Sequence, residues 1–277
     1  MPLPSPTPLS DVERIARLRA RVAELGRGAP GRLGIAIVDL FGDTHVSLRG
    51  TESVPLAGIE KLAIAFAAYR LVDQKRLQLE DRVIVTAADL RRAPSEIAAL
   101  HPDGDVSYTY WQLLRAMLVT DDNTASAVVL RRIGGPATVQ GILDRLGLRG
   151  IRLSRDPDAR ATSGTPDTIA ALLTGIIEHR LLFVDTTSEL FEALSHAENE
   201  PGRLRAGLED TVKLASISGT TATAGATTAA TNDTGIVTFP YGRRVVVTVF
   251  LAASTGDAAT RGAVIADVAR AVDAAFR

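Results

Sequence analysis

Lys61 is the side chain of this sequence that the pattern places best for chemistry. It lies in an apolar stretch, "VPLAGIEKLAIAFAAYRLVDQ" (54–74), which predicts a long helix that begins at Gly58. The residues that follow Lys61 are apolar (LAIAF), so we expect a buried lysine rather than one that snorkels to the surface. With Lys61 as a base, a hydroxyl could act as nucleophile in a hydrolysis reaction. The hydroxyls considered for this role are those of Ser53, Thr120, Ser126 and Ser218.

The residue types give less support to metal, disulfide or cofactor chemistry and to binding of nucleic acid or membranes. The chain has no cysteine, which excludes disulfides and thiolate metal sites. The histidines show no spacing typical of a metal site, so we expect no metal and no cofactor; they are His45, His101, His179 and His196. A net charge of −1 gives no reason to expect nucleic acid or an anionic membrane as partner. The arginine pairs, such as Arg131-Arg132 and Arg243-Arg244, are interpreted as solvated faces.

The surrounding pattern predicts the elements that must position Lys61. Helices are expected at 11–25 and 257–276, strands at 32–40, 43–50, 212–221, 231–240 and 243–254, and helices dominate from 58 to about 200. This order predicts an α/β (α+β) fold, in which an antiparallel five-stranded sheet is flanked by the N- and C-terminal helices. An all-helical lobe, 56–204, would be inserted into the sheet lobe formed by 1–55 and 205–277. A cleft between the lobes is the expected ligand site.

Three strings in this order resemble the class A serine β-lactamases and the wider penicillin-binding, glutaminase-like superfamily. They are "YRLVDQKRLQLEDRV" (69–83), the segment 107–148 around "TDDNTAS", and "VKLASISGTT" (212–221) followed by "TNDTGIVTFP" (231–240). The resemblance covers nearly the whole chain and implies the same two-lobe fold.

The resemblance also implies what stands at the active-site positions. The family carries a Ser-x-x-Lys motif at the start of its buried helix, in which the serine attacks the substrate and the lysine helps to take its proton. The backbone N–H groups at this helix end stabilise the oxyanion. Here the motif reads Gly58-Ile59-Glu60-Lys61, so no acyl-enzyme can form at position 58.

The family's second motif, Ser-Asp-Asn, reads Asp121-Asp122-Asn123. A carboxylate therefore replaces the serine that passes a proton to the leaving nitrogen, while Asn123 is kept. If the matched positions are occupied as in the family, Asp121 lies within a few ångströms of Lys61 and pairs with it. A cap of the following helix is an equally good interpretation of Asp121.

The remaining motifs also differ from the family pattern. The Lys-Thr-Gly strand reads Ile217-Ser218-Gly219, followed by Thr220, so the lysine that helps to hold the substrate carboxylate is lost. The stretch that matches the loop carrying the deacylating glutamate (151–168) contains no glutamate, although Asp156 or Asp158 could reach the cleft.

These departures favour a pseudoenzyme, inactive toward β-lactams, that binds a small molecule, peptide or protein in its cleft. The alternative is an active serine or threonine hydrolase (β-lactamase, amidase or esterase) with rewired catalytic residues. The Pro-rich start, "MPLPSPTPLS", has no apolar core of a signal peptide, and no apolar run is long enough to span a bilayer. As written, the sequence therefore predicts a cytoplasmic protein without membrane insertion, or an exported one if a signal has been removed. It predicts no oligomeric state.

Overall fold

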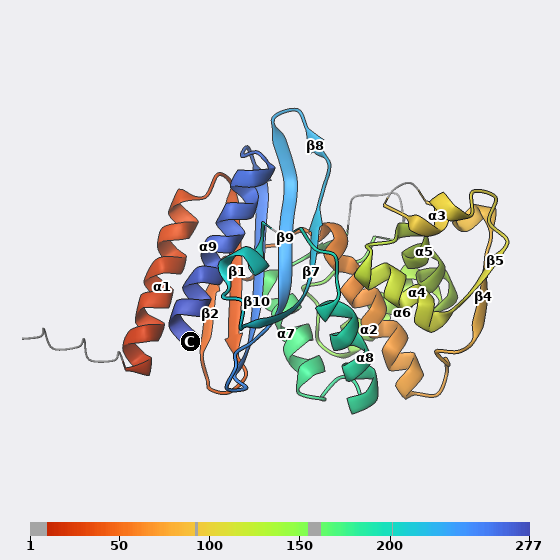
Figure 1. Ribbon diagram of the computed structural model, residues 1–277, viewed down its shortest axis with the longest axis horizontal. Coiled ribbons are helices and arrows are strands. Elements are labelled where there is room, and N and C mark those ends of the chain that lie inside the picture. The colour runs from red at the N-terminus through yellow and green to blue at the C-terminus, as the bar shows by residue number, and fades with distance from the viewer. Residues whose placement is uncertain (1–9, 92–93, 155–161, 201) are drawn as a thin grey trace, which may run out of the picture.

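The computed structural model describes residues 10–91, 94–154, 162–200 and 202–277. Its centre is an antiparallel sheet in which five strands follow the order β2-β1-β10-β9-β7, and a short strand, β8, pairs with β9 (Figure 1). The strands are β1 (Arg32–Asp39), β2 (His45–Leu48), β7 (Lys213–Thr220), β8 (Thr223–Ala224), β9 (Thr227–Thr238) and β10 (Arg244–Ser254). The expected five-stranded antiparallel sheet, built from both ends of the chain, is confirmed.

One face of the sheet is covered by the two terminal helices, α1 (Asp11–Gly28) and α9 (Ala258–Phe276) (Figure 1). Ser10 caps α1 through a capping box with Glu13, and Asp257 caps α9. Inward residues of alternate strand positions, such as Ile35, Val247 and Val249, meet the apolar stripes of both helices in one buried cluster. This layer explains why the chain ends fold together although they are far apart in sequence.

The other face of the sheet carries the larger core, which surrounds helix α2 (Glu60–Asp73). The helices of this lobe are α3 (Glu96–Leu100), α4 (Tyr110–Val119), α5 (Asn123–Arg132), α6 (Gly135–Arg145), α7 (Pro166–Ile177) and α8 (Val184–Ser195). Helix α7 packs on β1 and β10, and α2 lies among α4, α5, α6 and α8. Because these helices enclose the middle of α2, residues 62–69 are apolar on every face rather than amphipathic.

The inserted lobe is mainly helical, as expected, but it is not all-helical, because it also contains short strands. Strand β4 (Arg82–Val85) pairs with β5 (Val106–Thr109), and β3 (Val54–Pro55) pairs with β6 (Ser163–Gly164). In β4 the side chains alternate between exposed and buried, which is the period of a half-buried strand. A segment of this length between helical stretches gives too few repeats for its period to stand out.

None of the helices in the described part of the chain is long and apolar enough to cross a membrane.

Candidate functional site

The expected helix start at Gly58 is a short 3₁₀ turn, η1 (Ala57–Ile59), which runs directly into α2. Ala57 has a left-handed backbone (φ 54°), so the chain turns sharply before the helix. Lys61 lies in the first turn of α2 and keeps only 3% of its surface exposed, as the apolar pattern predicted. The turn therefore places Gly58 at the helix entrance and the ammonium group of Lys61 inside the protein.

The buried ammonium of Lys61 is held by three oxygens. Its Nζ donates to Asp121 Oδ1 at 2.5 Å, to the backbone oxygen of Asp121 at 2.5 Å and to Asn123 Oδ1 at 2.9 Å. A lysine ammonium has three N–H donors, so these contacts use all of them. The expected contact between Asp121 and Lys61 is present, and it engages the lysine as an ion-pair partner.

The capping role that was the alternative for Asp121 belongs to its neighbour. Asp122 is fully buried, and its carboxylate accepts from the backbone of Ala125 at 2.8 Å and of Ile97 at 2.9 Å. Asp122 is therefore the N-cap of α5. Asp121 instead has a left-handed backbone (φ 56°), which turns its side chain and its carbonyl toward the same lysine. Two adjacent carboxylates have different partners because the backbone reverses between them.

Strand β7 packs directly against η1. A Cβ added to Gly58 would lie 2.8 Å from the backbone oxygen of Ser218 and 3.4 Å from Asp121 Oδ1. A Cβ added to Gly219 would lie 2.2 Å from the backbone nitrogen of Gly58. The backbones of η1 and β7 are thus in close contact at two glycines, Gly58 and Gly219. A side chain at position 58 would project toward the Ser218 carbonyl of β7.

The four residues expected to line the cleft from β7 have different environments. Ile217 is 4% exposed and packs in the larger core, so its side chain offers a ligand little surface. Ser218 is partly buried, and its backbone N–H donates to Asn199 Oδ1 at 2.9 Å. Gly219 is the close-contact residue described above, and Thr220 is exposed at the end of the strand. Only Thr220 presents an exposed hydroxyl there.

Arg203 is a neighbour of this strand that sequence reasoning missed. It is 5% exposed, and its guanidinium donates to the Thr220 hydroxyl, to the backbone oxygen of Asn232 at 3.0 Å and to that of Gly219 at 3.4 Å. Arg203 ties the end of β7 to β9. It lies just before a 3₁₀ turn, in "PGRLRAG", where no hydrophobic period marks its direction, so the sequence held no signal for this contact.

Glu60 is a second missed group, between Gly58 and Lys61. Part of its side chain reaches solvent, but Oε2 is buried and has no hydrogen-bond partner in the described structure. Burial raises the pKa of this carboxyl to about 7, against the pull of the Lys61 charge in the other direction. A carboxyl that titrates near neutral pH therefore stands beside the helix entrance.

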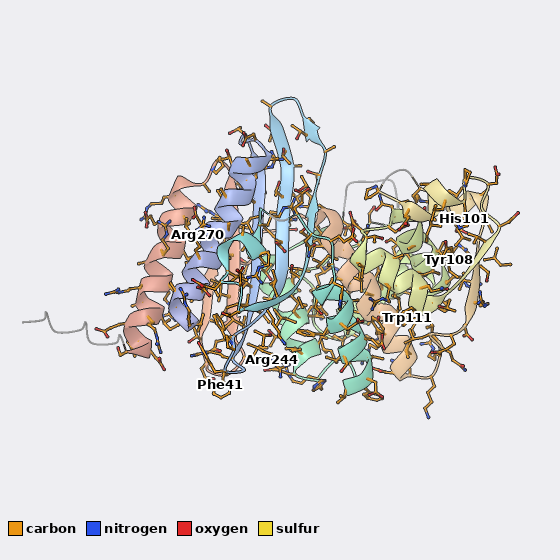
Figure 2. All side chains as sticks on the ribbon, viewed as in Figure 1. Phe41, His101, Tyr108, Trp111, Arg244 and Arg270 are labelled. Atoms are coloured by element: carbon orange, nitrogen blue, oxygen red, sulfur yellow. The ribbon has the colours of Figure 1, made fainter. Side chains whose placement is uncertain are left out.

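The other residues considered from the sequence lie apart from this cluster or are otherwise engaged. The Thr120 hydroxyl donates to the Ala116 carbonyl at 3.0 Å, and Ser53 is exposed before β3. Asp156 and Asp158 lie outside the described residues. His101 stands edge-on to Tyr108 at the outer end of the helical lobe (Figure 2). In the described parts of the chain, no group of three or more histidine and carboxylate residues could hold a metal ion.

Comparisons with known proteins agree with this architecture. Residues 17–276 match the model of the beta-lactamase enzyme family. The chain is 26% identical over 262 residues to the extended-spectrum β-lactamase PER-1 of Pseudomonas aeruginosa, covering 91% of this chain and 85% of that protein. It is 29% identical over 274 residues to a β-lactamase of Streptomyces albus G, covering 95% and 83% respectively.

Solved structures show the same fold. A β-lactamase from Chitinophaga pinensis superposes with a TM-score of 0.89 at 26% identity, covering 94% of this chain and 99% of that one. An ancestral class A β-lactamase superposes with a TM-score of 0.84 at 32% identity, covering 94% of this chain and all (100%) of that one.

Proposed function

The chain belongs to the β-lactamase enzyme family, and we propose that it is a non-catalytic member, inactive toward β-lactams, that binds a small molecule or peptide between its lobes. The observation that carries the proposal is Gly58 at the entrance of α2. The position has no side-chain oxygen, and the Ser218 carbonyl bounds the space where one would project. Without a nucleophile at the helix end, the N–H groups there have no covalent intermediate to stabilise.

The state of Lys61 supports the same conclusion. A lysine that accepts a proton must be neutral for part of the cycle, whereas this ammonium is buried against a carboxylate and two further oxygens. Deprotonation would leave Asp121 without its counter-ion. Lys61 therefore acts in the proposal as a structural partner that holds the loop before α5.

The charges at this point indicate what the site would bind. The Lys61 side chain is 4% exposed and the Asp121 side chain 49% exposed, so the carboxylate is the member of the pair that faces solvent. A ligand that approaches meets the negative partner first. We therefore expect neutral or cationic ligands to be preferred over carboxylates, the reverse of a site built for β-lactam carboxylates.

Incubation with penicillins and cephalosporins tests the proposal. We expect no increase in intact mass and no hydrolysis of a chromogenic cephalosporin above the background of buffer. A mass increase equal to the β-lactam, mapped to any residue, would contradict the proposal. A clean mass spectrum with measurable hydrolysis would also contradict it, because turnover can proceed without a trapped intermediate.

The second candidate is an active hydrolase with rewired residues, and Glu60 is the observation that favours it. Carboxyls that titrate near neutral pH are typical of general bases, and Glu60 adjoins the helix entrance. The nucleophile would be an activated water or one of the hydroxyls of Ser53, Thr120, Ser126 and Ser218. Labelling with a fluorophosphonate but not with a fluorescent penicillin would favour a hydroxyl nucleophile and reject the non-catalytic proposal. Loss of that labelling in Glu60→Gln would identify the base.

A further inference from the structure

A surface rich in arginine lies at the end of the helical lobe where α2, α5 and α6 terminate. We define the arginine surface as Arg70, Arg76, Arg82, Arg132 and Arg145. Two cavities open on it. One, of about 410 Å³, is lined by Arg76, Arg82 and Arg132 among others. The other, of about 260 Å³, is lined by Arg70, Arg76 and Arg145 among others. Arg76 lines both, so the two cavities adjoin at this side chain.

These guanidinium groups have few internal partners. None of the five forms an ion pair with another described residue, although the neighbouring Arg131 pairs with Asp89. Arg70 donates to the Leu181 carbonyl at 2.7 Å, and Arg76 makes a long contact of 3.5 Å with Gln74. Asp81 is the carboxylate that lines the larger cavity. Most of the N–H donors of the surface therefore remain available to a ligand.

Complementing helix dipoles is the simplest role for arginines at such a place. Helices α5 and α6 end at Arg132 and Arg145, and Arg70 lies in the last turn of α2. Each helix C-terminus carries about half a negative charge, so three of them contribute about −1.5. These helix ends and the Asp81 carboxylate together offset about 2.5 of the five guanidinium charges, so a charge of about +2.5 remains. Arg82, which lies on β4, ends no helix at all. Dipole compensation therefore accounts for only part of the charge, in a protein whose net charge is −1.

We propose that the arginine surface binds a small phosphate-containing anion that carries at least two negative charges, such as pyrophosphate. The planar fork of a guanidinium matches phosphate oxygens in a bidentate way, and several forks around one cavity favour a multivalent phosphate over a single carboxylate. A cavity of about 410 Å³ lies within the range of small-molecule sites. The site is separate from the Gly58 region and does not depend on the function proposed for that region.

Calorimetric titration of the full chain with inorganic pyrophosphate tests the proposal, with inorganic phosphate as the weaker comparison. We expect a pyrophosphate Kd of about 1 mM or tighter at low salt, weakening as salt screens the charges. Arg76→Gln and Arg132→Gln should each weaken binding about tenfold, because each removes one fork from the larger cavity. Both side chains are exposed, so the melting temperature without ligand should stay close to that of the wild type.

Arg27→Gln is the matched control. Arg27 is also exposed and in the last turn of a helix, but that helix is α1 in the sheet lobe. It should leave pyrophosphate affinity unchanged. Absence of pyrophosphate binding, or equal weakening by Arg27→Gln and Arg76→Gln, would overturn the proposal. Binding of a short single-stranded oligonucleotide more than about tenfold tighter than pyrophosphate would also overturn the proposal. The surface would then be a binding site for nucleic acid rather than for a small anion.

Discussion

Lys61 shows how a charged side chain can stay inside an apolar helix. Its burial costs solvation energy that only close, complete coordination can offset. Asp121 supplies both a carboxylate and a carbonyl, and Asn123 supplies the third oxygen. This requires the left-handed backbone at Asp121, which directs both oxygens to one ammonium. The ion pair, the backbone strain and the loop conformation therefore depend on one another.

Replacing Asp121 should destabilise the fold in an order set by what remains near Lys61. Asp121→Ala removes the counter-charge and places alanine in a left-handed backbone, so we expect a loss of about 2–4 kcal/mol in the free energy of unfolding. Asp121→Asn keeps an oxygen near Lys61 and a residue that tolerates this backbone, so the loss should be about 1–2 kcal/mol. Urea denaturation of the variants measures both values.

Asp105 provides the control for the backbone contribution. It is an exposed aspartate with nearly the same left-handed conformation (φ 54°) and forms no ion pair with another described residue. Asp105→Ala reports the cost of alanine in that backbone alone. If Asp121→Ala costs no more than Asp105→Ala, the contact with Lys61 contributes nothing to stability.

At the scale of elements, the contact between η1 and β7 determines what position 58 can hold. The two segments approach through backbone atoms, with Gly58 on one side and Gly219 on the other. Strand β7 is fixed in turn by its ladder with β9 and by Asn199, so it cannot retreat without breaking those hydrogen bonds. The glycine at the helix entrance is thus part of the packing between η1 and β7.

Gly58→Ser should therefore lower stability and should not create a β-lactamase. Its Cβ would stand 2.8 Å from the Ser218 carbonyl, so β7 or η1 must shift, at a cost of about 1–3 kcal/mol. The returned hydroxyl would still face Asp121 and an engaged Lys61. Thermal unfolding and chromogenic cephalosporin turnover are the measurements. Turnover of about 1 per second or faster would show that the other departures matter little.

Gly28→Ser is the companion variant for that experiment. Gly28 ends α1, and a Cβ there meets no other group within 4 Å. It should leave the melting temperature nearly unchanged. A similar loss in both variants would mean that serine itself, rather than the contact with β7, is unfavourable.

How well an element could be predicted depended on how long an apolar periodic pattern its sequence contains. The strands from both chain ends and the terminal helices follow long apolar periods or clear caps, and the structure places them close to the expected bounds. The β4–β5 pair was not foreseen, because its two short strands lie within a stretch of the chain where helical periodicity dominates. Lys61 was foreseen as buried, whereas Arg203 and Glu60 were not recognised, since their environments arise from segments distant in sequence. Which of Asp121 and Asp122 caps α5 depends on the left-handed backbone at Asp121. Two adjacent aspartates in a sequence do not indicate which of them adopts that conformation.

At the scale of the whole molecule, two cores share one sheet. The terminal helices close one face and the helical lobe closes the other (Figure 1). Between them, β9 is buried along most of its length and carries Asp233, whose pKa burial raises to about 7. Glu60 has a raised pKa of the same size at the entrance of α2. Two carboxyls with raised pKa values therefore link the stability of the fold to pH.

The sign of this linkage follows from which state holds the proton. Between the ordinary glutamate pKa of 4.5 and the folded value of about 7, folded Glu60 binds a proton that the unfolded chain has released. Its contribution to stability is greatest below the lower value and is lost as pH rises toward 7. Asp233 acts in the same direction from its ordinary value of 3.8. Asp89, whose pKa is lowered when Arg131 and Thr86 bond to it, acts in the opposite direction.

Glu60→Gln should remove one part of this pH dependence. The amide resembles the protonated acid, so at about pH 5 the variant and the wild type should have similar stability. At about pH 8 the variant should be more stable by about 2–3 kcal/mol, because position 60 then carries no charge that burial penalises. Glu80→Gln, at an exposed glutamate, should leave the pH profile unchanged. Urea denaturation at both pH values gives the comparison, and the contributions of Asp233 and Asp89 cancel when each variant is referred to the wild type. A Glu60→Gln variant that is less stable than the wild type at about pH 8 would mean that the ionised carboxylate stabilises the site, as a charge paired with Lys61 would.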